Sequence, residues 1–144
     1  MRLHGILFLA SALFFSGCAT SRVQTQNIES AHRLALLFKI CDNSDSWEYY
    51  PTTLQDLSKA LRALHIEDAI PQCRCADGRL RDFIYVPRFS SSDGRDWPFL
   101  FSPPEMGGNV VIVADLDATT RAMSREEARK EMEKSYAFTK DRIH

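Results

Sequence analysis

The hydrophobic and polar positions along the chain predict two amphipathic helices after a short polar stretch. Apolar residues recur at helical spacing over residues 28–41 and again over residues 54–64. The first segment stops in the turn-forming sequence DNSDS, and the second follows Thr52 and Thr53, either of which is a candidate N-cap. His65 lies at the end of the second segment, where a helix-end or surface position is expected.

The pattern then changes to strands and finally returns to a helix. Strand-forming residues occupy four short segments, which are residues 82–87, 97–104, 109–114 and 119–122. The prolines that bound the second of these segments favour an edge position in the sheet. Ser124 and Glu127 form a capping box, which predicts a closing helix with Ala128, Met132 and Tyr136 turned inward.

This order of elements predicts the fold class. Helices that are separate in sequence from an antiparallel meander are typical of an α+β domain. We expect an N-terminal helix and a second helix packed on a small antiparallel sheet, which a C-terminal helix closes. Aromatic residues are concentrated between residues 47 and 101, and packing between the sheet and the first helix explains most of them.

The first 17 residues have the pattern of a secretory signal. Arg2 is followed by an apolar run over residues 6–15 and by the small residues Ser16 and Gly17, which precede Cys18. An apolar run of ~10 residues is too short to cross about 30 Å of hydrocarbon as a helix. Small residues directly before a cysteine resemble the bacterial lipobox, which implies cleavage before Cys18 and lipidation of its thiol. An ordinary secreted protein and a retained transmembrane anchor are the alternatives.

Cleavage before Cys18 would divide the chain into three parts. Residues 1–17 form the signal peptide, residues 18–27 a lipidated cysteine with a flexible tether, and residues 28–144 a single periplasmic domain. Ala19 follows the cysteine in place of the aspartate that commonly retains lipoproteins at the inner membrane, so the outer membrane is favoured. Without Arg2 the mature chain has 17 basic and 19 acidic residues, which gives no reason to expect nucleic acid as a partner.

Export also bears on the remaining cysteines, because disulfides persist in an oxidising compartment. Cys41, Cys73 and Cys75 are an odd number, so we expect one disulfide and one free thiol. Cys41 would then bond to Cys73 or to Cys75. Unpaired thiols are the alternative, and a zinc site that combines these cysteines with His65 lacks the usual ligand spacing.

Asp115 and Asp117 are the main candidates for chemistry. They lie two residues apart and would share a face of an extended segment, where paired carboxylates can bind calcium or do acid–base work. Aspartate is also a common turn residue, because it tolerates left-handed backbone and hydrogen-bonds to nearby amides. His32 and the serines at 90–92 are not in an arrangement typical of a catalytic triad, so a non-catalytic protein is expected.

Three segments together resemble the periplasmic domains of type IV pilin-like and type II secretion pseudopilin-like proteins, including those with a prepilin-type processing-associated C-terminal domain. They are AHRLALLFKICDNSDSWEYYPTTLQDL, PQCRCADGRLRDFIYVP and GGNVVIVADLDATTRAMSREEARKEM. The chain has no prepilin cleavage site, so the resemblance implies a pilin-like head on a lipid anchor that is not expected to polymerise as a pilin does. It also implies contacts with envelope or secretion proteins, and calcium as a candidate ligand near Asp115 and Asp117. A lipoprotein that binds a cation or a small ligand is the alternative function.

Overall fold

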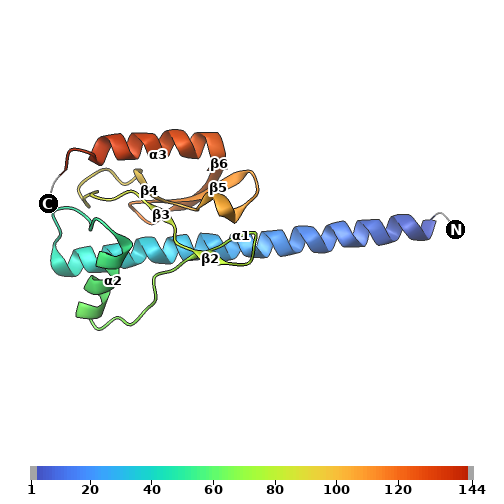
Figure 1. Cartoon of the computed structure of the whole chain (residues 1–144), viewed down its shortest axis with the longest axis horizontal. Helices are drawn as coiled ribbons and strands as arrows, with labels where there is room; N and C mark the ends of the chain where they lie inside the picture. The colour runs from blue at the N-terminus through green and yellow to red at the C-terminus, as the bar shows by residue number, and fades with distance from the viewer. Residues whose placement is uncertain (1–2, 143–144) are drawn as a thin grey trace.

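The computed structural model describes residues 3–142, with side chains from residue 22 onward. The fold is α+β, as predicted: α1 lies along one face of a sheet and α3 covers the other face (Figure 1). The elements in chain order are α1 (Leu3–Asp45), α2 (Leu54–Ala63), β1 (Cys73–Arg74), β2 (Leu80–Arg81), β3 (Ile84–Tyr85), β4 (Pro98–Phe101), the 3-10 turn η1 (Pro104–Met106), β5 (Val110–Asp115), β6 (Thr120–Ser124) and α3 (Arg125–Thr139).

The main sheet is antiparallel and has the strand order β3-β4-β5-β6, while β1 and β2 form a separate hairpin. The predicted edge position for β4 is therefore wrong, since β4 pairs with β3 on one side and β5 on the other. Pro98 is the first residue of β4, and Pro103 follows the end of the strand. Neither proline removes an N–H from the interior of the strand, so an inner position is compatible with both.

α1 begins well before the predicted start of the first helix. Residues 22–27, which were expected to belong to a flexible tether, are helical, and Asn27 is buried. Its side-chain Nδ2 donates to the Arg74 carbonyl at 3.0 Å, and its Oδ1 accepts from the Arg74 N–H at 2.8 Å. These two hydrogen bonds satisfy the backbone C=O and N–H of Arg74, as a neighbouring strand would. They also hold the β1–β2 hairpin on α1. Cys18 falls within the helical span of α1, but its side chain lies outside the described residues.

The core lies between α1 and the sheet, with the Phe38 ring at its centre. The centroid of this ring is 5.4 Å from that of Tyr50, 4.9 Å from that of Tyr85 and 5.2 Å from that of Phe99. The three pairs are stacked, tilted and edge-on in turn, and burying each ring stabilises the fold by roughly 1.5–3 kcal/mol. The expected aromatic core between helix and sheet is confirmed.

The starts of the two shorter helices are set by their N-caps, as predicted. Thr53 caps α2 by accepting from the Asp56 N–H, and Ser124 and Glu127 form the reciprocal capping box of α3. The predicted inward face of α3 is only partly right. Ala128 is buried and Met132 packs against the core, as predicted, but Ser135 and Thr139 take the inward positions further along the helix, while Tyr136 is exposed.

Among the residues whose side chains are described, no helix is long and apolar enough to cross a membrane.

Candidate functional site

The β5–β6 turn holds both predicted carboxylates and gives them different surroundings. Asp115 ends β5 and is 3% exposed. Its Oδ1 lies 3.2 Å from the Arg121 Nη2 but has no hydrogen-bond partner among the described residues, so the contact is an ion pair without hydrogen-bond geometry. Burial raises the pKa of Asp115 to about 6; Arg121 opposes this shift, and nearby carboxylates add to it. Asp115 therefore exposes little of its side chain to a ligand from solvent, because the residue is buried behind the turn.

Asp117 serves the turn itself. Its Oδ1 accepts from the Thr119 N–H at 2.9 Å, and this hydrogen bond lowers the pKa of Asp117. Ala118 follows with a φ of 68° and donates its N–H to the Asp115 carbonyl at 2.9 Å, which makes a three-residue hairpin loop with a left-handed third residue. His32 of α1 reaches the same turn, with its Nδ1 2.7 Å from the Ala118 carbonyl, so this ring nitrogen carries the donating hydrogen.

Within the part of the chain whose side chains are described, no group of three or more histidine, cysteine, aspartate or glutamate residues is placed to hold a metal ion. Calcium at Asp115 and Asp117 stays a prediction.

A polar hollow of about 520 Å³ lies on the other side of the turn. It is bounded by the last turns of α1, the loop over residues 90–96 and the β5–β6 turn. Its charged lining residues are Lys39, Asp42, Arg95 and Asp117. Asp42 is buried, and its Oδ1 has no hydrogen-bond partner in the described part of the chain. Charges of both signs and an unsatisfied carboxylate oxygen suit a small polar ligand.

Cys41, Cys73 and Cys75 are free thiols, and all three are buried. The backbone geometry explains why Cys41 does not pair with the other two. Arg74 is bonded to Asn27, and Cys41 lies 14 residues further along α1, or about 21 Å at the helical rise. A disulfide requires Cα atoms within about 7 Å, so the predicted bond from Cys41 to Cys73 or Cys75 does not fit this fold. Burial raises the pKa of Cys73 to about 12, with the neighbouring Cys75 adding to the shift.

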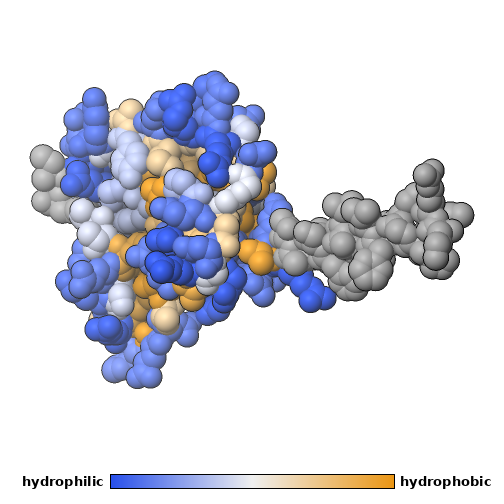
Figure 2. Space-filling model, turned by 45° about the vertical axis from the view of Figure 1, so that its right-hand side comes forward, coloured by the Kyte–Doolittle hydropathy of each residue, from blue (hydrophilic) through white to orange (hydrophobic). Residues whose placement is uncertain are grey.

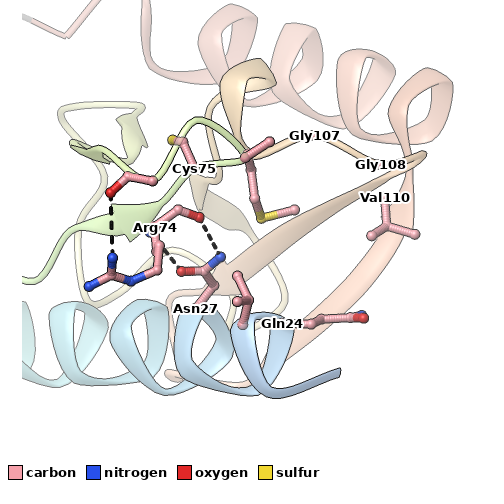
Figure 3. Close-up of a pocket in the computed structure, with 11 residues that line it drawn as sticks. Gln24, Asn27, Arg74, Cys75, Gly107, Gly108 and Val110 are labelled. Carbon is pink, nitrogen blue, oxygen red and sulfur yellow. Dashed lines mark hydrogen bonds between the residues drawn. The ribbon is translucent and has the colours of Figure 1, made fainter. Parts of the chain in front are cut away.

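An apolar hollow of about 470 Å³ lies at the opposite end of the head, where α1 leaves it (Figure 3). α1 contributes Val23 and Asn27 to its lining, the β1–β2 hairpin contributes Cys75 and Ala76, and the segment around η1 contributes Met106 and Val110. Gly107 and Gly108 close the rim with φ values of 84° and 72°, a conformation that side chains disfavour. A Cβ at Gly107 would also lie 3.0 Å from the Ala76 Cβ, so glycine is needed there for close approach.

Sequence reasoning missed both hollows, because each is built from segments that are distant along the chain. For the apolar hollow, the only local signal is the Gly107-Gly108 pair ahead of a strongly apolar strand. The predicted lipidation residue, Cys18, lies on the same helix as this hollow, five residues before Val23.

A scan against models of protein families and searches of curated proteins and of solved structures find no match for this chain.

Proposed function

We propose that this chain is a non-catalytic bacterial envelope lipoprotein. In this proposal the mature chain begins at a lipidated Cys18, and the α+β head acts through contacts with other envelope or secretion proteins. The observation that carries the proposal is α1, a single helix that runs through the position of Cys18 and continues as the spine of the head. A long N-terminal helix lying along an antiparallel sheet is also the arrangement that the pseudopilin resemblance implies.

The residues that could suggest catalysis have structural partners, which supports a non-catalytic role. His32 bonds to the Ala118 carbonyl. The hydroxyls of Ser90 and Ser92 lie 3.0 Å apart, and the Ser90 N–H is bonded to Asp93, so these serines shape a loop.

The outer face of α1 is the best candidate for a protein contact. Leu36 and Ile40 are one helical turn apart and are 38% and 43% exposed. They lie on the side of α1 opposite its buried positions, away from the sheet. Two adjacent apolar side chains on an otherwise polar helix face are a small patch that a partner protein could cover.

Cell fractionation tests the anchoring part of the proposal. The chain with its native sequence is expected in the membrane fraction. The Cys18→Ser variant is expected to lack the lipid and to leave that fraction. Cys41→Ser is the matched control, because it removes a buried thiol and leaves the anchor intact. Membrane association that is unchanged in Cys18→Ser would contradict the anchoring.

Photo-crosslinking in the native envelope tests the contact part. A crosslinker at Ile40 is expected to give a discrete protein adduct, and one at Lys130, an exposed residue of α3, is expected to give none. If Leu36 and Ile40 yield no adduct in cells that express the chain at its natural level, the proposed contact face is wrong.

The polar hollow favours a second candidate function, the binding of a cation or a small polar ligand. The unsatisfied, buried oxygen of Asp42 is the observation that supports it. Calcium is the first probe. It should raise the melting temperature of the native-sequence chain, and it should raise that of the Asp117→Asn variant by less. An identical melting temperature with calcium and with a chelator would remove calcium from consideration.

A further inference from the structure

We propose that the anchor-side end of the head docks on the lipid headgroup layer, with anionic headgroups as its ligands. The docking surface is the rim of the apolar hollow, formed by Val23, Met106 and Val110 together with the β1–β2 hairpin. This inference rests on the proposed lipidation of Cys18.

The first argument is the short distance between the anchor and the hollow. α1 runs without interruption through both Cys18 and Val23, and five residues of helix span about 7.5 Å. The headgroup region of a bilayer adds roughly 5–8 Å of polar material outside each face of the hydrocarbon core. A lipid on Cys18 therefore holds Val23 at or just above the headgroups. In Figure 1 the hairpin tip and the segment around η1 are turned toward the projecting part of α1, which is the direction of the anchor.

The second argument is the apolar character of this end. Val110 is 36% exposed, Val23 and Met106 are half-buried, and Gly108 leaves its backbone exposed at the rim. Figure 2 shows hydrophobic surface beside the point where the described side chains of α1 begin. Small apolar groups around such a hollow can insert between lipid headgroups, and this insertion would remove them from water.

The third argument is charge. The mature chain is acidic on balance, but the β1–β2 hairpin over residues 73–81 contains three arginines and one aspartate. Asp77 pairs with Arg81 at 2.9 Å. Arg74 and Arg79 are exposed and form no ion pair with the described residues, and Arg22 of α1 adds a third such cation. Glu105 of η1 is an exposed acid beside this surface and interacts with Arg81. Arg22, Arg74 and Arg79 still leave this end of the head with a net positive charge, which suits the anionic lipids of a bacterial membrane.

The test uses the full lipidated chain in vesicles of phosphatidylethanolamine and phosphatidylglycerol, in which some acyl chains are brominated close to the headgroup. Val110→Trp places a fluorophore on the proposed surface, and bromine quenches tryptophan only at close range. The native Trp47 and Trp97 serve as internal controls, because they pack near the far end of α1 and the start of β4. We expect the fluorescence added at position 110 to lose most of its intensity and the native signal to change little.

Charge reversal tests the electrostatic part in the Val110→Trp background. Arg74→Glu and Arg79→Glu are each expected to weaken docking by about fivefold or more. Arg129→Glu, on exposed α3, is the matched control and is expected to leave quenching unchanged. Vesicles of phosphatidylcholine alone should give much weaker quenching.

The outcomes separate this inference from the proposed function. If the chain does not float with vesicles, the lipid anchor itself is refuted. If the chain floats but position 110 is not quenched, the anchor stands and the docking is refuted. Equal quenching with and without phosphatidylglycerol would overturn the role of anionic headgroups. In the native envelope, a crosslinker at position 110 that captures a protein and no lipid would make this end a protein interface instead.

Discussion

Removing the Asn27 side chain should detach the β1–β2 hairpin from α1. Asn27 is buried and satisfies both the N–H and the carbonyl of Arg74, at 2.8 and 3.0 Å. Asn27→Ala deletes both bonds and leaves the two backbone groups without a protein partner. The substitution also tests whether residues 22–27 belong to the folded head or to a loose tether.

The size of the effect follows from the two bonds and their surroundings. Each hydrogen bond contributes roughly 0.5–1.5 kcal/mol net, and an orphaned buried group costs about 1–3 kcal/mol. Both flanks of Asn27 open onto hollows, so water can reach Arg74 in the variant, which favours the lower end of the range. Alanine also favours a helix over asparagine by roughly half a kcal/mol. We therefore expect Asn27→Ala to lower the free energy of unfolding by about 2 kcal/mol.

Urea unfolding of the two proteins measures this difference, and hydrogen exchange adds a local measurement. The Arg74 amide should exchange much faster in Asn27→Ala, because its acceptor has been removed. Gln26→Ala is the matched control: Gln26 is the exposed preceding residue of the same helix, and its loss should change stability by less than about 0.5 kcal/mol. The reasoning is refuted if Asn27→Ala unfolds like Gln26→Ala and the Arg74 amide keeps its protection.

Three further predictions concern buried ionisable groups. Because the pKa of Asp115 is raised to about 6, its contribution to stability is present below pH 4 and is lost as the pH rises through 6. Asp115→Asn should therefore be more stable than the native sequence by about 1–3 kcal/mol at pH 8 and equal to it at pH 4. Equal unfolding curves at pH 8 would contradict this. Since the pKa of the Cys73 thiol is about 12, a thiol reagent at pH 8 should modify this residue only after denaturant is added. Rapid labelling of the folded chain would show that the Cys73 thiol is accessible to solvent. Arg142 makes a bidentate ion pair with the mostly buried Asp93, so Arg142→Ala should lower the free energy of unfolding by about 2–4 kcal/mol. Arg129→Ala breaks an exposed ion pair and should lower it by less than about 0.5 kcal/mol. Similar losses for the two variants in calorimetry would refute this difference.

The elements that the sequence predicts well are those whose determinants are local. The capping residues Thr53 and Ser124 bond to amides within three residues of themselves, so their patterns are readable without the fold. The strongest strand, β5, has a run of apolar residues long enough to identify it. The α+β class followed from the order of these elements.

The errors arise where distant partners decide the outcome. Residues 22–27 look like a tether because nothing nearby in sequence indicates that Asn27 will bond to Arg74. The strands β1 and β2 are two residues each, too short for any period to be detected. On α3, spacing every four residues from Ala128 leads to Tyr136, but a helix turns once in 3.6 residues, so the inward face drifts to Ser135, whose hydroxyl donates to the Pro98 carbonyl at 2.7 Å.

For the candidate sites too, the local features could be predicted from sequence and the long-range contacts could not. The positions of Asp115 and Asp117 at a turn could be read from sequence, but the burial of Asp115 beside Arg121 could not, since it depends on packing across the hairpin. The disulfide expectation used only the number of cysteines. The length of α1 between Asn27 and Cys41 is the fact that separates the thiols.

The most direct test of the central claim is the intact mass of the mature chain purified from the cell envelope. Cleavage before Cys18 with lipidation predicts the mass of residues 18–144 plus a diacylglyceryl group and an amide-linked acyl chain, with no mass lost to a disulfide. The mass of the uncut chain, or of a cut chain that carries no acyl groups, would contradict the account.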